Sequence, residues 1–268
     1  MHEHKLGLVM INSVVRGLDV AAAGFRTLYE YIALYISLAV FGMGGVLFSL
    51  LAAAIYPFLP RRFGARLGRL LVTCIFWPYL VFIQSTGLFK CDISALDALS
   101  NDESIIIVSN HPGLIDVVLV CSRLTNIVCI MKKEIQENIL FGGCARLAGY
   151  ICNDSTGNMV RVAVDELKQG GQLLIFPEGT RTVMHPVNKF TGAFALIARR
   201  AGVPVQTVFI EYTSAFLGKG WPLWRKPQFP LTFRVTLGKR FEVGSDIISF
   251  VDDLENYFRE RLVVKKSD

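Results

Sequence analysis

The sequence is poor in charged residues: Asp, Glu, Lys and Arg make up only 19% of its 268 residues, whereas 52% are hydrophobic. Soluble globular domains usually contain about 25% charged residues. This shortage excludes a disordered protein, a coiled coil and a typical cytosolic enzyme. The composition instead favours a protein that meets a membrane.

Several motifs are also absent. No two of the six cysteines form a C-x-x-C pair, and no cysteine–histidine cluster has zinc spacing, so we expect buried thiols in a reducing compartment and no metal site. His2 and His4 flank Glu3, but they have no third ligand partner. The absence of G-x-S-x-G, H-E-x-x-H and G-x-x-x-x-G-K-[ST] argues against a serine hydrolase, a zinc protease and a P-loop enzyme.

The net charge of +6 raises the question of nucleic-acid binding. Much of the excess lies in residues 60–69, which contain four arginines and no acid, while residues 90–268 hold 21 basic and 19 acidic residues. A nucleic-acid binder would spread a basic face over its folded domain. A basic segment between two apolar segments instead predicts a juxtamembrane loop near anionic lipid headgroups, so we expect membrane lipids and no nucleic acid as partners.

Two uncharged runs flank that basic segment. Residues 31–59 contain no charge and would form a helix of about 43 Å, against a hydrocarbon thickness of about 30 Å. The glycine cluster at 42–45 is the expected weak point of this helix, and close helix packing is the favoured use of its glycines. Residues 70–89 form the second run. We therefore predict a membrane-anchoring helical segment over residues 1–89.

Residues 90–268 have the pattern of an α/β domain. Short apolar runs predict strands, amphipathic stretches predict helices, and their alternation predicts a mixed, largely parallel sheet flanked by helices. Ser245 is the expected N-cap of the last helix. The expected strands cover 104–110, 126–133, 172–179, 203–210 and 231–238, and the expected helices cover 114–123, 158–169, 194–201 and 245–262.

The stretch SNHPGLIDVV contains the first candidate for chemistry. His111 directly follows a predicted buried strand, and Asp116 comes five residues later at the start of a predicted helix. A histidine at the exit of a core strand lies at the carboxyl edge of the sheet, where open α/β folds bind ligands. A carboxylate that holds one ring nitrogen frees the other as a general base. The alternative is a capping aspartate beside an ordinary loop histidine.

The stretch LLIFPEGTRT contains the second candidate. Glu178, Gly179 and Arg181 follow a predicted strand that ends at Pro177. Glycine lets the backbone approach a ligand closely, and arginine can bind a phosphate or carboxylate through two hydrogen bonds. The alternative is a turn with a surface ion pair. If both strands end at the same edge of the sheet, His111 and Arg181 come together there.

The motifs N-H-P-G-L-I-D and F-P-E-G-T-R resemble the two most diagnostic blocks of the glycerolipid acyltransferases, which include the 1-acylglycerol-3-phosphate acyltransferases. Lys189, Phe190 and Gly192 resemble the K-x-F-x-x-G stretch of that family, and GVPVQTVFI resembles its fourth block, within a resemblance that covers about 90–260. The apolar N-terminus is similar to the membrane-binding segments of bacterial members.

The resemblance implies a membrane-bound O-acyltransferase with a donor thioester of acyl carrier protein or coenzyme A, and with no metal or cofactor. Backbone amides near Pro112 and Gly113 are the expected oxyanion donors. A catalytically idle lipid or acyl-carrier binding protein is the alternative. The implied catalytic residues are His111 and Asp116, and the implied substrate-binding residues are Asn110, Glu178, Gly179, Thr180, Arg181 and Lys189.

One block departs from the family pattern. Members that act on phosphate-bearing acceptors usually end a G-x-x-F-x-x-R stretch with arginine, but here the matching stretch, 149–155, ends with Ser155 after Asp154. Loss of this cation predicts that lysophosphatidate is a poor acceptor. The G-Y-I-x-N-D form resembles divergent bacterial members of aryl-polyene and unusual fatty-acyl pathways, which favours acyl carrier protein as donor.

The expected location follows from the donor. A domain that uses cytosolic thioesters must face the cytoplasm, so we expect the inner membrane with the catalytic domain, residues 90–268, on its cytoplasmic side. Two full spans would place the domain and the basic segment on opposite sides. We therefore favour one span, or none with residues 70–89 in the interface.

Overall fold

The computed structural model describes the backbone of residues 2–264 and the side chains of residues 16–263, so the side chains of His2, Glu3 and His4 lie outside the described residues. The chain divides into two compact units, Met1–Val40 and Phe41–Asp268. The second unit therefore includes residues 41–89 as well as the sheet domain, and the division into an anchoring and an acyltransferase part at residue 90 stays a prediction.

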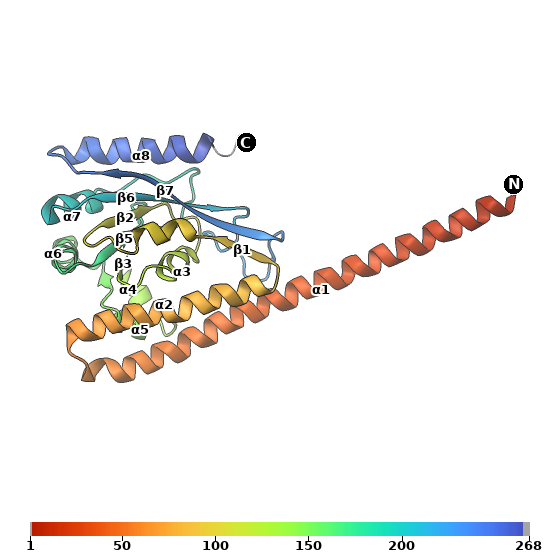
Figure 1. Ribbon diagram of the computed structural model, residues 1–268, viewed down its shortest axis with the longest axis horizontal. Coiled ribbons are helices and arrows are strands. Elements are labelled where there is room, and N and C mark those ends of the chain that lie inside the picture. The colour runs from red at the N-terminus through yellow and green to blue at the C-terminus, as the bar shows by residue number, and fades with distance from the viewer. Residues whose placement is uncertain (1, 265–268) are drawn as a thin grey trace. The chain divides into compact units, whose positions relative to one another are not determined.

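The second unit is built on a seven-stranded sheet of order β1-β7-β6-β2-β5-β3-β4 (Figure 1). The five neighbouring strands β6, β2, β5, β3 and β4 run parallel, whereas β7 is antiparallel to β6 and parallel to β1. The mixed, largely parallel sheet is thus confirmed. The strands are β1 (Phe89–Asp92), β2 (Ile106–Ser109), β3 (Ile127–Met131), β4 (Ile151–Cys152), β5 (Gln172–Ile175), β6 (Val205–Tyr212) and β7 (Leu231–Phe241).

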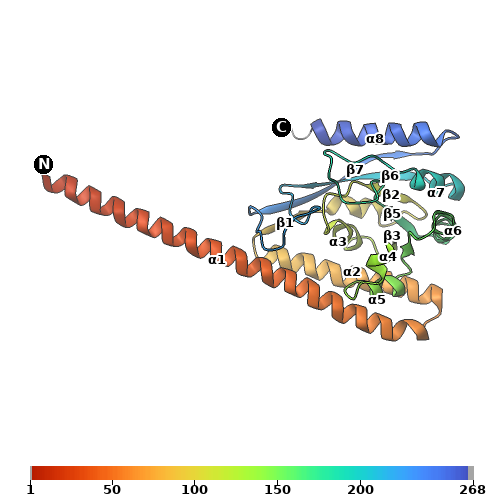
Figure 2. The same cartoon turned by 180° about the vertical axis from the view of Figure 1, so that it is seen from behind.

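Helices cover both faces of this sheet. On one face, apolar side chains of α6, α7 and α8 share a single core with alternate residues of β2, β5 and β6, such as Val108, Leu173 and Phe209. On the other, α2 packs against α3, α5 and β1, as both views show (Figure 1, Figure 2). The helices of the sheet domain are α3 (Asp116–Cys121), α4 (Lys133–Gln136), α5 (Gly142–Leu147), α6 (Thr156–Leu167), α7 (Ala193–Ala201) and α8 (Ile247–Val264), with a 3₁₀ helix at Ser94–Leu99.

Two apolar helices precede the sheet. Helix α1 (His2–Ile55) runs without a break through the glycine cluster, so the weak point expected at 42–45 does not interrupt it. A 3₁₀ turn (Tyr56–Phe58) leads to α2 (Arg61–Ser85). Both Arg16–Phe58 and Arg61–Ser85 are long and apolar enough to cross a membrane by length and composition.

Helix α2 approaches the sheet domain through small residues. A Cβ atom on Gly68 would lie only 2.6 Å from the backbone nitrogen of Ala148, so only glycine allows this contact. Gly149, in turn, faces Ala65 of α2, where an added Cβ would lie 3.1 Å from the alanine Cβ. One side of α2 is therefore in protein rather than in solvent or lipid.

The four arginines of the basic segment do not act as one headgroup-binding loop. Every residue of the segment except Pro60 is helical, because α2 begins at Arg61 and its first turns contain Arg61, Arg62, Arg66 and Arg69. Arg69 is only 4% exposed and pairs with the carboxylate of Glu166 at 2.6 Å, whereas the other three are exposed. Three arginines, not four, are thus available to lipid headgroups.

Two smaller expectations also need correction. The side chain of Asp246, not that of Ser245, caps α8, because its Oδ1 accepts a hydrogen bond from the backbone N–H of Ser249 at 3.0 Å. Cys121, Cys129 and Cys144 are buried as expected, but the Cys74 side chain on α2 is exposed. Neither the identity of the α8 cap nor the exposure of Cys74 changes the order of helices and strands.

Candidate active site

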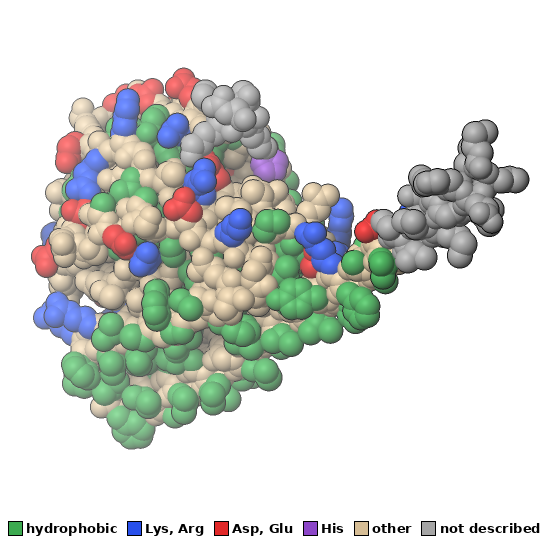
Figure 3. Space-filling model, turned by 45° about the vertical axis from the view of Figure 1, so that its right-hand side comes forward, with side chains coloured by type: hydrophobic (Ala, Val, Ile, Leu, Met, Phe, Trp, Pro, Cys, Tyr) green, Lys and Arg blue, Asp and Glu red, His purple; other side chains and the backbone are tan. Residues whose placement is uncertain are grey.

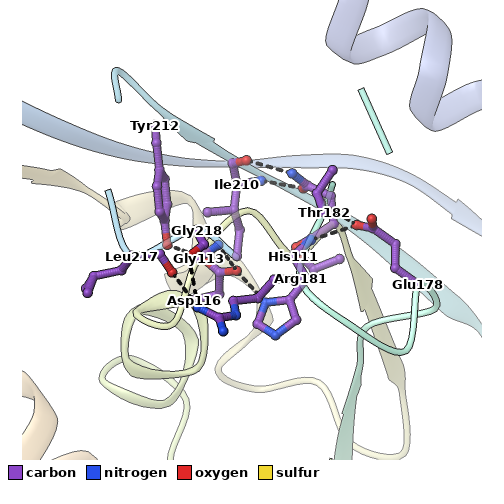
Figure 4. A network of polar contacts seen from close by, with 12 residues as sticks. His111, Gly113, Asp116, Glu178, Arg181, Thr182, Ile210, Tyr212, Leu217 and Gly218 are labelled. Carbon is purple, nitrogen blue, oxygen red and sulfur yellow. Dashed lines mark hydrogen bonds and ion pairs between the residues drawn. The ribbon is translucent and has the colours of Figure 1, made fainter. Parts of the chain in front are cut away.

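The candidate site lies where three neighbouring parallel strands end. The loop after β2 carries His111, the loop after β5 carries Glu178 and Arg181, and β6 ends at Tyr212. Because β5, β2 and β6 are adjacent and parallel, their carboxyl ends meet at one edge of the sheet. The two motifs recognised in the sequence therefore come together as expected, and Figure 4 shows their side chains converging.

His111 and Asp116 form a tight pair. The distance from His111 Nδ1 to Asp116 Oδ2 is 2.6 Å, and the aspartate side chain is fully buried while the histidine remains 18% exposed. The imidazole also stacks on the ring of Phe176, with centroids 4.0 Å apart and planes at 16°. With Nδ1 donating to the carboxylate, Nε2 is the nitrogen left with a lone pair. The arrangement suits a general base.

Asp116 accepts two further hydrogen bonds. The backbone N–H of Gly113 donates to Oδ2 at 3.0 Å, and the hydroxyl of Tyr212 donates to Oδ1. Burial raises the pKa of the Asp116 carboxyl above its usual range, and the hydrogen bonds from His111, Tyr212 and Gly113 oppose that rise. Tyr212 belongs to no motif in the sequence, and its contact with a residue 96 positions earlier left no local signal.

The amides expected to stabilise an oxyanion are already used. Pro112 has no N–H, the Gly113 N–H donates to Asp116, and the Leu114 N–H donates to the carbonyl of Leu217 at 3.2 Å. The expectation that amides near Pro112 and Gly113 form the oxyanion hole is therefore not supported, because folding of this loop consumes those donors.

The Glu178 side chain connects the loop after β2 with the loop after β5. Its Oε1 accepts from the backbone N–H of His111 at 2.9 Å and from the Thr182 hydroxyl at 2.8 Å, and its Oε2 accepts from the Asn188 N–H at 2.8 Å. Burial raises the pKa of this carboxyl, and the three hydrogen bonds oppose that rise. These contacts give Glu178 a positioning role instead of the acceptor-binding role implied by the resemblance.

Asn110 likewise serves the fold. Its amide nitrogen donates to the carbonyl of Ile210, and its amide oxygen accepts from the N–H of the same residue, both at 2.8 Å. The side chain is only 4% exposed. It extends the pairing of β2 with β6 beyond the strand end, so its contacts do not support the expected role in substrate binding.

Arg181 is the cation of the site. Its Nη1 donates to the carbonyl oxygens of Leu217 and Gly218, each at 3.0 Å. No Asp or Glu among the described side chains forms an ion pair with it, so its charge is not neutralised by the protein. Figure 4 shows its guanidinium and the His111 ring directed to the same side of the loops.

The remaining implied binding residues are accessible to a ligand. Gly179 is exposed with φ of +65°, and a Cβ placed on it would meet nothing within 4 Å. Thr180 is half-buried and Lys189 is exposed. Within the described part of the chain, no group of three or more His, Cys, Asp or Glu side chains is placed to hold a metal ion.

Comparison with known proteins agrees with this geometry. A family model described as Acyltransferase matches residues 90–211, which include β2, β5, both motif loops and all of β6 except Tyr212. Residues 90–211 therefore form a domain that matches the acyltransferase family model. This domain contains the His111–Asp116 pair, Glu178 and Arg181.

Relatives of this acyltransferase domain differ in their named acceptors. A lyso-ornithine lipid O-acyltransferase of Pseudomonas aeruginosa is 36% identical over 110 residues, or 39% of this chain and 42% of the relative. A 1-acyl-sn-glycerol-3-phosphate acyltransferase of the same species is 25% identical over 139 residues, or 50% of this chain and 52% of the relative. The chain thus spans about half the length of the curated relatives it matches.

A solved structure shares the acyltransferase fold. The 1-acyl-sn-glycerophosphate acyltransferase PlsC from Thermotoga maritima superimposes with a TM-score of 0.66, covering 91% of this chain and 98% of that chain at 18% sequence identity. Ser155, which the sequence resemblance places where members acting on phosphate carry arginine, is exposed between β4 and α6. Asp154 beside it is exposed as well.

Proposed function

We propose that this chain is a membrane-bound O-acyltransferase that moves an acyl group from a carrier thioester to the hydroxyl of a lysolipid. The observation that carries the proposal is the His111–Asp116 pair, with its buried carboxylate at 2.6 Å from Nδ1, at a sheet edge that also presents the unneutralised Arg181. This combination provides a base for a hydroxyl next to a cation for a polar or anionic headgroup.

The proposed reaction needs one base and no covalent enzyme intermediate. His111 Nε2 removes the proton of the acceptor hydroxyl while that oxygen attacks the thioester carbonyl carbon. The C–S bond then breaks, and the leaving thiolate takes the proton from Nε2. The proton between Nδ1 and Asp116 stays in place, and the carboxylate stabilises the transient imidazolium. General-base catalysis of this kind contributes roughly 10²- to 10⁴-fold to the rate.

The proposed acceptor follows from two opposite charges, Arg181 in the loop after β5 and Asp154 in the loop after β4. Arg181 retains a positive charge, whereas Ser155 and Asp154 replace the cation that phosphate-using relatives carry. A hydrogen bond to a charged group contributes about 1.5–3 kcal/mol, so a phosphate monoester would bind roughly ten- to a hundredfold more weakly than in an arginine-bearing relative. A lysolipid with a different polar headgroup, such as lyso-ornithine lipid, fits better than lysophosphatidate.

Conventional synthesis of phosphatidate is the second candidate. The match to a 1-acyl-sn-glycerol-3-phosphate acyltransferase and the charge of Arg181 favour it.

For the donor, we propose a thioester of acyl carrier protein in preference to coenzyme A, because the 149–155 stretch resembles divergent bacterial members. A single transfer assay distinguishes between the two acceptors and between the two donors.

The helices supply the proposed membrane contact. Exposed apolar side chains line the end of α1 and the solvent side of α2, where Figure 3 shows a band of hydrophobic side chains. Contacts of Phe41 with Phe76 and Tyr79 pack this end of α1 onto α2. With its other side held by the sheet domain, α2 suits the interface of the inner membrane with the site at the cytoplasmic side. The exposed residues include Met43, Leu47, Leu50, Leu51, Phe58, Phe63, Leu70, Trp77 and Val81.

A transfer assay with the purified full chain tests the proposal. Acyl carrier protein and coenzyme A thioesters are each offered with an amino-acid-based lysolipid, a phosphate monoester lysolipid and a neutral monoacylglycerol. Release of free thiol is measured together with the diacylated product. We expect both in equal amounts with a non-phosphate lysolipid. Binding of donor and acceptor without thiol release would instead identify an idle binding protein.

A further inference from the structure

A tyrosine outside both motifs contacts the candidate catalytic pair. Tyr212 is the last residue of β6, the strand next to β2, and its hydroxyl donates to Oδ1 of Asp116. Oδ2 of the same carboxylate accepts from His111 Nδ1 at 2.6 Å and from the Gly113 N–H at 3.0 Å. Tyr212, Asp116 and His111 thus form one line of hydrogen bonds (Figure 4).

We infer that Tyr212 is a positioning residue of this acyltransferase: its hydroxyl holds the Asp116 carboxylate so that Oδ2 faces His111, and it moderates the basicity of the imidazole. The inference rests on the proposed function and extends it, because it adds Tyr212 to the His111–Asp116 pair. These three hydrogen-bonded residues are called the relay below. It assigns to the end of β6 a role in catalysis that neither the H-P-G-L-I-D nor the F-P-E-G-T-R motif contains.

The tyrosine ring has little freedom to swing away. A Cβ atom on Gly113 would lie 2.6 Å from Cε2 of Tyr212, so the ring lies directly on the glycine backbone. On another side, the ring meets Phe233 of β7 edge to face, with centroids 4.8 Å apart and planes at 80°. The glycine of the H-P-G-L-I-D motif is therefore required at this point by the tyrosine ring, which links the motif to β6.

The tyrosine stays a donor over the working range of pH. Burial, and then the negative charge of Asp116, raise the pKa of the Tyr212 hydroxyl well above its ordinary value. The other titratable group that faces it is the thiol of Cys91 on β1, whose pKa burial raises to about 12, so it stays neutral. Among the described residues, the titratable side chains that hydrogen-bond to Asp116 are those of His111 and Tyr212.

Two effects on catalysis follow from this contact. A carboxylate has two equivalent oxygens, and the Tyr212 donor distinguishes them, which fixes the plane in which Oδ2 meets Nδ1. The same donor draws part of the carboxylate charge away from His111. Without it, the charge would act more strongly on the imidazole, favour the imidazolium, and leave less free base at a given pH.

The variant Tyr212→Phe tests the inference because it removes only the hydroxyl and keeps the ring against Gly113 and Phe233. We expect kcat to fall roughly tenfold or more, KM to change little, and the acidic limb of the kcat–pH profile to move to higher pH by roughly half a unit or more. Tyr257→Phe is the matched control: Tyr257 on α8 is also half-buried, and its hydroxyl accepts from the Lys239 N–H at 3.0 Å, away from the site.

A double-mutant cycle identifies the route of the effect. In an Asp116→Asn background, Tyr212→Phe should change kcat by less than about twofold, because the relay is already broken. The inference is overturned if Tyr212→Phe leaves kcat and the pH profile like those of Tyr257→Phe. It is equally overturned if the loss is the same with Asp116 and with Asn at that position, since Tyr212 would then act directly on substrate.

A readout without substrate separates this inference from the proposed function. The Nδ1 proton of His111, observed by NMR, should move downfield in Tyr212→Phe and stay in place in Tyr257→Phe. A shift in a protein that shows no transfer would support the relay and refute the proposed activity. Normal transfer with no shift would refute the relay and leave the activity standing.

Discussion

Two arginines of the chain lie at polar junctions and differ in whether a carboxylate balances their charge. Arg69 joins α2 to the sheet domain: its Nη2 pairs with Glu166 at 2.6 Å, its Nη1 donates to Asn126, and its Nε donates to the carbonyl of Ala148. Its charge is balanced by a carboxylate, and it is almost fully buried. This arginine is fully engaged by the fold.

Among the side chains and backbone that the structure describes, Arg181 at the carboxyl edge donates only to the carbonyls of Leu217 and Gly218. Carbonyl oxygens orient a guanidinium but leave its net charge in place. The two arginines thus differ both in burial and in counter-charge: Arg69 is buried beside a carboxylate, whereas Arg181 is half-buried beside carbonyl oxygens. Four arginines lie in the first turns of α2, whereas the F-P-E-G-T-R motif contains one. The arginine at the candidate site is the motif arginine, Arg181.

The largest expected effect concerns Arg69, the arginine that joins α2 to the sheet domain. Arg69→Ala leaves Glu166 without its cation and should lower the free energy of unfolding by about 3 kcal/mol. Arg66→Ala, one turn earlier in α2 and exposed, should change it by less than about 0.5 kcal/mol. Denaturant titration in detergent measures both. Equal effects would show that the Arg69 pair does not anchor α2.

Next in size is the contact with lipid headgroups. Replacing Arg61, Arg62 and Arg66 by glutamine should weaken binding to anionic vesicles by roughly a hundredfold at low salt, because each of the three charges contributes about 1 kcal/mol near the surface. The difference should shrink as salt screens it. The control replaces three other exposed residues: Lys168, which directly follows α6, and Arg199 and Arg200 of α7. If both triple variants lose affinity equally, net charge alone drives binding.

A smaller gain is expected from adding a cation at the ligand side. Ser155→Arg should raise kcat/KM for lysophosphatidate by roughly ten- to a hundredfold, because it restores a charged hydrogen bond worth about 1.5–3 kcal/mol. Thr156→Arg adds the same charge one residue later, at another exposed position, and should have little effect. Wild-type preference for lysophosphatidate, with no gain from Ser155→Arg, would support the conventional phosphatidate assignment.

The smallest effect concerns stability at alkaline pH. The folded protein raises the pKa of Tyr212 above its ordinary value of 10.0. The stability contributed by the protonated hydroxyl is therefore fully present below about pH 10 and lost as pH rises through the folded-state pKa. Melting temperatures of wild type and Tyr212→Phe should differ by a constant amount up to about pH 9 and converge above pH 10. A gap that stays constant to high pH would show that Tyr212 does not titrate differently on unfolding.

Much of the site could be predicted from the sequence because its parts are local. β2, β5 and β6 are β-branched or apolar runs, and each motif directly follows its strand. Parallel strands that share an edge then bring His111 and Arg181 together without further information. The pair His111–Asp116 needs only one turn of chain. Short sequence distance is what made these features predictable.

The remaining features depend on contacts between distant parts of the chain. Tyr212 meets Asp116 across 96 positions, and Arg69 meets Glu166 across 97. Asn110 reads as a motif residue, but its pairing with Ile210, 100 positions later, uses its amide. β4 has only two residues, too few to show any periodicity. These features emerge only when the sheet assembles, so composition and spacing could not reveal them.

The most direct test of the account is turnover by the purified full chain with a thioester donor and a lysolipid acceptor, in wild type and His111→Ala. We expect wild type to release thiol and form diacylated product in equal amounts. His111→Ala should reduce both by at least ~10²-fold, with an unchanged melting temperature, and Asp116→Asn should also be severe. Equal thiol release by wild type and His111→Ala would contradict the account, because the base at the carboxyl edge would then not carry the reaction.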